Sequence, residues 1–312
     1  MSQTILFVHG RDFKPRRSAL WPLWKTAVRH GLERDHPAAL EAYDGAIKEF
    51  IYFGDISNEF LRSKGRDYDE DADIASRRQT LDDLRQYSRG QFNRRTYSRL
   101  PGKDAFKEFL ADSLSILTSP IGLSEFLITS VATDMREYWN FDSDFGSRIR
   151  ATMTGPLKRA MNRGDEILVV SHSLGTMLAW DTFWKFSHTS EYRQRYAEHQ
   201  IDLWLTLGSP LTDTTVKRNL KGARAHGLRR YPHNVRRWVN IAAEDDYICH
   251  DKTAANDYRR MRELSPPTRI ADRKIYNLAV RSGTSNPHHG CGYLVSPTVS
   301  KLIADWLQSR AM

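Results

Sequence analysis

The pentapeptide Ser-His-Ser-Leu-Gly at residues 171–175 contains a serine in a position suited to nucleophilic chemistry. An apolar run precedes it at 167–170, and the segment after it has a helical pattern. A serine between a buried strand and a helix lies on a sharp turn, which exposes its hydroxyl and points backbone N–H groups at any oxygen that gains negative charge nearby. The motif therefore predicts that Ser173 is the nucleophile of an acyl transfer. The alternative is that Ser173 is a buried turn residue that only caps the helix beginning at Leu174.

A serine hydroxyl is a weak nucleophile at neutral pH and needs an adjacent base. The loop at 286–292 contains two histidines and follows the last expected strand. A loop in that position reaches the carboxyl ends of the strands, where ligands bind in open α/β sheets. We expect His289 to be the base, with His288 as the close alternative. The alternative for each histidine is a structural role, in which it only hydrogen-bonds the main chain of the loop.

The base needs a carboxylate that fixes its tautomer and stabilises the imidazolium. Asp245 and Asp246 follow the expected strand at 237–242, so they lie at the same edge of the sheet. We expect Asp246 to be this acid, with Asp245 and Asp213 as alternatives. The alternative for each aspartate is a structural role, as a solvated loop residue or a helix cap.

The first expected strand ends in His9-Gly10-Arg11. A glycine there lets the main chain approach the serine turn, so we expect the N–H groups of Arg11 and Leu174 to form an oxyanion hole. The structural reading is that Gly10 only makes the turn after the strand. We expect His9 and His172 to have structural roles.

The elements that position these residues are predicted from six short apolar runs, at 4–8, 49–53, 166–170, 203–207, 237–242 and 274–279. Most are continuously apolar, which is typical of parallel strands covered on both faces. Helical patterns separate them, so the sequence predicts an α/β protein with a doubly wound, mostly parallel sheet of about six or more strands.

The spacing of the strands is broken once, because more than 110 residues separate Phe53 from Glu166. One crossover helix needs far fewer. Two amphipathic patterns occur in this stretch, one with Phe106, Phe109, Leu110, Leu114 and Leu117, the other with Leu123, Leu127, Val131, Met135 and Tyr138. We interpret residues 56–145 as a helical cap inserted in a single domain over 1–312. The alternative is that these helices simply cover the sheet.

Taken together, these segments resemble the α/β-hydrolase family, particularly its lipase and esterase branch. The resemblance is carried by Phe-Val-His-Gly at 7–10, Ser-His-Ser-Leu-Gly at 171–175, Leu-Gly-Ser-Pro-Leu at 207–211, Asp-Tyr-Ile at 246–248 and the histidine loop followed by Tyr-Leu at 293–294. The order of serine, aspartate and histidine agrees with the family. The chain departs from the usual pattern at Ser171, where the family normally has glycine, and residues 56–145 lie outside the resemblance.

The resemblance implies a serine hydrolase that cleaves carboxylic esters through an acyl-enzyme, without a cofactor, and that accepts a small-molecule or lipid ester with an apolar acyl group. An amidase, a thioesterase or an acyltransferase would use the same residues. The alternative from a different class is a non-catalytic, membrane-associated binding module that keeps the fold.

The composition agrees with an ordinary globular protein, because the 312 residues are 40% hydrophobic and 27% charged. No stretch approaches the roughly 18 to 20 apolar residues that cross a bilayer, and we expect a cytoplasmic protein. The net charge is +9, and residues 217–237 contain eight Lys or Arg and no acid. We interpret this run as a solvated loop and helix face, with weak contact with anionic membranes through 217–237 as the alternative, and we expect no specific nucleic acid.

The two cysteines, Cys249 and Cys291, lie in the loops that carry the expected acid and base. With His250, Asp251, His288 and His289 they suggest a zinc site, but their spacing matches no standard ligand pattern. We therefore expect no metal, and we expect the two thiols to be close neighbours.

Overall fold

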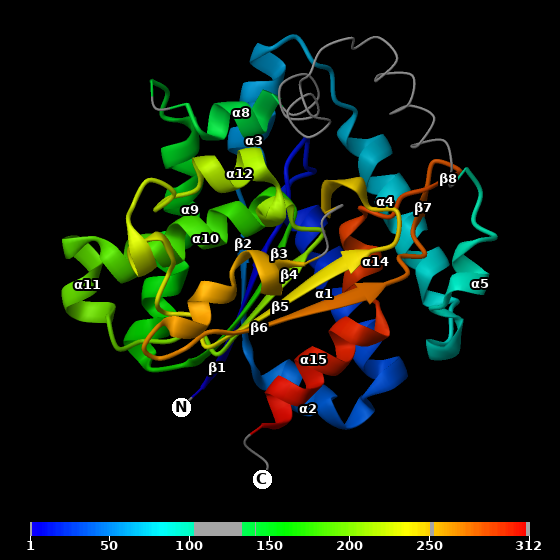
Figure 1. Ribbon diagram of the computed structural model, residues 1–312. Coiled ribbons are helices and arrows are strands. Elements are labelled where there is room, and N and C mark those ends of the chain that lie inside the picture. The colour runs from blue at the N-terminus through cyan, green and yellow to red at the C-terminus, as the bar shows by residue number, and fades with distance from the viewer. Residues whose placement is uncertain (1, 103–132, 141, 250–252, 310–312) are drawn as a thin grey trace.

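The computed structural model describes residues 2–102, 133–140, 142–249 and 253–309, and its centre is a six-stranded parallel sheet (Figure 1). In sequence order the strands are β1 (Gln3–Val8), β2 (Ile47–Ile51), β3 (Glu166–His172), β4 (Leu203–Leu207), β5 (Arg237–Ala243) and β6 (Arg269–Ile275). Their order in the sheet is β2-β1-β3-β4-β5-β6, and every neighbouring pair is parallel.

This strand order contains one reversal, between β1 and β3. From β1 the chain adds β2 on one side, whereas β3 to β6 are added in sequence on the other side. At such a point the loops after two adjacent strands leave in opposite directions, and a crevice opens at the carboxyl ends of the strands. The turn at Ser173 follows β3 and Gly10 follows β1, so both lie at this crevice.

Helices cover both faces of the sheet, as Figure 1 shows. On one face lie α9 (Phe145–Arg163), α10 (Leu174–His188) and α11 (Ser190–Tyr196), and on the other lie α1 (Arg17–Asp35), α14 (Gly290–Leu294) and α15 (Pro297–Gln308). Successive residues of β3 enter different cores, with Ile167 and Val169 on the α10 side and Leu168 and Val170 on the α1 side. Burial on both faces explains why this strand is continuously apolar.

Most of the remaining elements are short, and the longest of them is α4, with 16 residues. They are α2 (Leu40–Gly45), α3 (Gly54–Ser63), α4 (Glu70–Arg85), α5 (Arg94–Tyr97), α8 (Thr133–Tyr138), α12 (Thr214–Asn219), α13 (Ala254–Asp257) and the antiparallel hairpin of β7 (Val280–Arg281) and β8 (Thr284–Ser285). Helix α4 packs on α1, α14 and β7. It thereby reaches the crevice from the α1 side of the sheet.

The segment 56–145 is described only in part. Helix α3 packs on α8 and α9, and Met135 and Tyr138 of α8 are buried in the core on the α10 side. The helical face expected at 106–117 lies outside the described residues, as do Leu123, Leu127 and Val131 of the face expected at 123–138. The interpretation of 56–145 as an inserted cap stays a prediction.

The predicted α/β class and the six-stranded parallel sheet are confirmed, and two strand positions are corrected. The last strand is Arg269–Ile275 rather than 274–279, because this edge strand is rich in charged residues and the apolar run begins only at its end. Leu278 and Ala279 are buried but lie beyond the strand. The second strand likewise ends at Ile51, two residues before Phe53. Among the described residues, no helix has the length and apolar character needed to cross a membrane.

Candidate active site

Ser173 lies between β3 and α10 in a backbone conformation that L-residues rarely adopt, with φ 54° and ψ −128°. Such a conformation costs free energy and persists only where neighbouring groups enforce it. The N–H of Ser173 donates to the carbonyl oxygen of Leu207 at 3.0 Å, and its own carbonyl accepts from the N–H and hydroxyl of Thr176 at 2.9 and 2.7 Å. These bonds to β4 and α10 hold the turn.

Two glycines allow the end of β1 to pack against this turn. A Cβ at Gly10 would lie 2.7 Å from the Cβ of Ser173, and a Cβ at Gly175 would lie 2.4 Å from the carbonyl oxygen of His9. Ser171 is accommodated differently, because its hydroxyl accepts a hydrogen bond from the indole of Trp204 at 2.8 Å inside the core. A serine therefore fits where the resemblance leads one to expect a third glycine.

The hydroxyl of Ser173 is hydrogen-bonded to His288, at 2.9 Å from Oγ to Nε2. The other ring nitrogen, Nδ1, lies 2.9 Å from Oδ2 of Asp246. A carboxylate accepts, so Nδ1 of His288 carries the hydrogen and Nε2 is left to accept from the serine. This tautomer can take the hydroxyl proton when the oxygen attacks an electrophile.

Asp246 is almost fully buried, and other donors hold its carboxylate in place. Tyr293 donates its hydroxyl to Oδ2 at 2.6 Å, and the N–H of Ile248 donates to Oδ1 at 3.1 Å. Space for the hydrogen bond with His288 comes from Gly208, where a Cβ would lie 2.8 Å from Oδ2 of Asp246. Asp246 thus lies where the sequence led us to expect it.

The choice of histidine requires a correction, because His288 and not His289 contacts Ser173. The two are adjacent in a loop, and His289 has an extended backbone with φ −69° and ψ 124°. Successive side chains of extended backbone point to opposite sides, so only one of the two can face the serine. His289 lies instead in the wall of the neighbouring cavity, nearly fully buried.

The register of this loop is set by two side chains that bond its main chain. The ring Nε2 of His172 donates to the carbonyl oxygen of His288 at 2.8 Å. The amide of Asn277 donates to the carbonyl oxygens of Pro287 and His289 at 2.9 and 3.0 Å. Burial lowers the pKa of His172 well below its usual value, so this ring is neutral and structural, as expected.

The alternative acids have other partners. Asp213 caps α12, because its Oδ1 accepts from the N–H groups of Thr215 and Val216 at 2.8 and 3.0 Å. Asp245 accepts a hydrogen bond from the hydroxyl of Tyr97 at 3.2 Å. Helix capping thus accounts for Asp213, and a loop contact for Asp245.

The two expected oxyanion donors flank the turn. Leu174 is the first residue of α10, whose first N–H groups have no acceptor within the helix. On the other side, Nδ1 of His9 donates to the carbonyl oxygen of Gly10 at 2.8 Å. Because N–H and C=O of a trans peptide point in opposite directions, this bond also fixes the direction of the Arg11 N–H.

His9 can serve in this way because its own protonation state is fixed. Its Nε2 accepts from the N–H of Phe53 at 3.1 Å, which leaves the hydrogen on Nδ1. Burial lowers the pKa of His9 to about 3. The ring stacks on Phe53 with the two ring centres 3.9 Å apart. His9 is thus a buried, neutral donor to the main chain at Gly10.

Both cysteines are free and buried. The thiol of Cys249 contacts the carbonyl oxygen of Asp246 at 3.4 Å and the hydroxyl of Tyr293 at 3.8 Å. Burial raises the pKa of Cys291 to about 11. Within the described residues, which exclude His250 and Asp251, no group of three or more His, Cys, Asp or Glu could hold a metal ion.

A cavity of about 630 Å³ opens at Ser173 and His288. Part of its wall is apolar, formed by Phe13, Leu20, Trp24, Met135, Val216 and Ile248. The rest is charged, and includes Lys14, Arg77 and Arg281. Sequence reasoning missed these three cations, as well as the positioning roles of Tyr293, Asn277 and Gly208. Tyr293 and Gly208 do lie in segments that carry the resemblance, at 293–294 and 207–211, whereas Asn277 and the three cations had no such signal.

The residues that line this cavity include none from the basic run at 217–237. Lys217 pairs with Asp257 at 2.7 Å. The indoles of Trp180 and Trp184 donate to the carbonyl oxygens of Lys221 and Arg229 at 3.1 and 2.9 Å, which ties the segment to α10. Its contact with anionic membranes stays a prediction.

In comparisons with known proteins, no family model, no curated protein and no solved structure matches this chain.

Proposed function

We propose that the protein is a serine hydrolase that cleaves carboxylic esters through an acyl-enzyme. The observation that carries this proposal is the line of hydrogen bonds from Ser173 through His288 to Asp246, at the edge of a cavity. The rare backbone conformation of Ser173 supports it further, because strain of this kind is concentrated at functional sites.

In the proposed reaction, Oγ of Ser173 forms a bond to the carbonyl carbon of the ester while its proton moves to Nε2 of His288. Asp246 stabilises the resulting imidazolium. The carbonyl oxygen becomes an oxyanion that the N–H groups of Leu174 and Arg11 stabilise. The bond to the leaving oxygen then breaks, and His288 delivers the proton to the departing alcohol. Water repeats these steps on the acyl-enzyme and releases the acid.

We further propose that the sheet is an α/β-hydrolase fold. The resemblance of the segments around Gly10, Ser173 and Gly208 supports this, since each of these residues lies at the carboxyl edge where the reaction would occur. Cleavage of an amide or a thioester, or transfer to an acceptor alcohol, would need the same groups and a different leaving or accepting atom.

Fluorophosphonate labelling and hydrolysis of 4-nitrophenyl butyrate test the proposal directly. We expect wild-type protein and Ser147→Ala, which alters an exposed serine, to be labelled and active. Ser173→Ala should not be labelled, and its kcat should be lower by about 10³- to 10⁶-fold. Equal labelling of Ser173→Ala and wild type would overturn the proposal, as would an unlabelled, inactive wild-type protein.

A further inference from the structure

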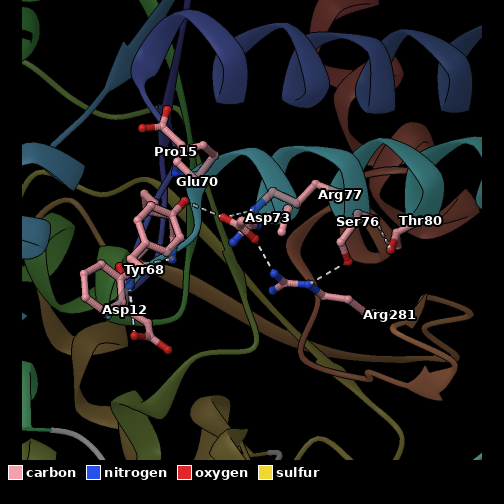
Figure 2. Close-up of polar contacts among 12 residues, drawn as sticks. Asp12, Pro15, Tyr68, Glu70, Asp73, Ser76, Arg77, Thr80 and Arg281 are labelled. Atoms are coloured by element: carbon pink, nitrogen blue, oxygen red, sulfur yellow. Dashed lines mark hydrogen bonds and ion pairs between the residues drawn. The ribbon is translucent and has the colours of Figure 1, made fainter. Parts of the chain in front are cut away.

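The charged wall of the cavity contains a cluster of residues from three distant segments (Figure 2). Asp73 and Arg77 lie on α4, Arg281 lies on β7, and Lys14 follows β1. His289 belongs to the same wall, beside the base. The proposed catalytic steps use none of these five side chains.

Asp73 is the anchor of the cluster. One of its oxygens, Oδ2, accepts from Nε of Arg77 at 3.0 Å and from the hydroxyl of Tyr68 at 2.7 Å. The other, Oδ1, pairs with Nη2 of Arg281, whose Nε donates to Ser76 at 3.3 Å. Two guanidinium groups thus share one buried carboxylate, and together the three groups carry a net positive charge.

The other acids of the cavity wall form their bonds with groups other than Arg77 and Arg281. Asp12 pairs with Arg66 at 3.0 Å, and the side chain of Asp69 caps α4 by accepting from the N–H of Ala72 at 2.9 Å. Asp213 caps α12. Each of these carboxylates already has a partner away from Arg77 and Arg281.

Lys14 adds a further cation, whose Nζ bonds main-chain carbonyl oxygens and forms an ion pair with no carboxylate among the described residues. Its side chain is only 8% exposed, and Nζ donates to the carbonyl oxygens of Arg11 and Phe13. Burial, with the neighbouring charge of Arg77, lowers the pKa of Lys14 to about 7. A bound anion would add to the stabilisation that the nearby carboxylates of Asp12, Asp73 and Asp134 give this ammonium.

His289 is the most direct sign of a ligand. It is 4% exposed, and within the described part of the chain neither Nδ1 nor Nε2 has a hydrogen-bond partner. A buried polar group without a partner is costly, and native proteins rarely leave one unpaired. Burial and the charges of Arg77 and Arg281 keep the ring neutral, by lowering its pKa well below the usual value. A neutral ring still offers one N–H.

We propose that this wall is an oxyanion-binding subsite, in which Arg77, Arg281 and Lys14 hold a carboxylate or phosphate group and His289 donates its ring N–H. This inference rests on the proposed esterase activity in one respect: it makes the substrate an ester that carries a second, anionic group. The scissile carbonyl then lies at Ser173, the anionic group lies against α4 and β7, and the apolar wall holds the connecting chain.

Binding is tested without turnover, by isothermal titration of inorganic phosphate and, separately, of glutarate into Ser173→Ala protein at constant ionic strength. The two probes distinguish a phosphate from a carboxylate ligand. We expect Arg281→Gln and Arg77→Gln, each added to Ser173→Ala, to weaken the preferred anion by about 10- to 100-fold. The matched control is Arg273→Gln, which removes an exposed arginine of β6 and should leave affinity unchanged.

Substrate preference gives a second readout, from the ratio of kcat/KM for mono-4-nitrophenyl glutarate to that for 4-nitrophenyl butyrate. We expect a ratio above one in the wild type and a fall of at least about 10-fold in Arg281→Gln. Arg281 is 30% exposed at a hairpin, so this variant should fold even if Arg77→Gln does not.

The outcomes separate this inference from the proposed activity. Anion binding that depends on Arg281, with no labelling of Ser173, would support the subsite and reject the hydrolase. The subsite alone would be overturned if the enzyme were labelled and active but bound neither anion. It would also be overturned if Arg281→Gln left the affinity for each anion unchanged.

Discussion

His172 donates from its ring Nε2 to the carbonyl oxygen of His288 at 2.8 Å, and so joins the turn that carries Ser173 to the loop that carries its partner. The centres of the two imidazole rings lie 4.7 Å apart. The residue directly before the serine therefore positions the residue that accepts its hydrogen bond. Its effect is on the main chain of the loop, not on a reacting atom.

Replacing His172 by alanine should therefore lower kcat of the proposed hydrolase by about 10- to 100-fold, because small displacements of a catalytic group have effects of this size. KM should change little. The exposed residue His226 offers the matched control, His226→Ala, with wild-type kinetics expected. An unchanged kcat in a folded His172→Ala protein would show that the loop keeps its position without this bond.

Substitution of the two adjacent histidines should have unequal effects on turnover of a neutral ester. His288→Gln removes the proposed base, so kcat should fall by about 10²- to 10⁴-fold. His289→Gln removes a side chain that does not contact Ser173, so the effect on 4-nitrophenyl butyrate should stay below about 10-fold. Steady-state kinetics of both variants measure this difference. The reverse order would reinstate His289 as the base.

Tyr293 should contribute to both stability and activity, because its hydroxyl donates to Asp246 and accepts from the N–H of Ala243 at 2.9 Å. Tyr293→Phe leaves both buried partners with one bond fewer, at a cost of about 1–3 kcal/mol in the free energy of unfolding. We also expect kcat to fall several-fold, since Asp246 loses a positioning donor. Urea denaturation measures the first effect, with Tyr87→Phe at a half-exposed tyrosine as the control. Equal unfolding midpoints for both variants would contradict this role.

The sequence was sufficient to locate Ser173 and Asp246, because each lies within three residues of the carboxyl end of a largely apolar strand that the sequence predicts. It was not sufficient to choose between His288 and His289. That choice depends on which way one loop residue points, and bonds from His172 and Asn277, far away in the sequence, decide it. Local sequence patterns do not predict such long-range contacts.

The three cations of the cavity wall could not be predicted from the sequence for the same reason. Lys14, Arg77 and Arg281 are separated by more than 60 residues from one another, and each belongs to an ordinary polar segment. Only the packing of α4 against β7 brings the two arginines to one carboxylate. The net charge of the chain indicated a preference for anions, but it directed attention to 217–237 and not to this cavity.

Lys14 should give the protein a pH-dependent stability that a neutral side chain lacks. Burial lowers its pKa from 10.5 to about 7 in the folded protein, while nearby Asp12, Asp73 and Asp134 oppose this shift. Below about pH 7 both states hold the proton, and the folded state bears the full cost of the buried charge. Between about pH 7 and 10.5 the unfolded chain binds one more proton, so the free energy of unfolding rises with pH.

The difference in unfolding free energy between wild type and Lys14→Met should therefore increase by about 1.4 kcal/mol per pH unit above pH 7, and should be flat below it. Urea denaturation of the two proteins from pH 5.5 to 9.5 measures this difference, and groups that titrate alike in both proteins cancel. Parallel stability curves across that range would mean that Lys14 keeps an ordinary pKa. An added anion at the cavity should move the onset of the rise to higher pH, because a bound negative charge favours the protonated amine.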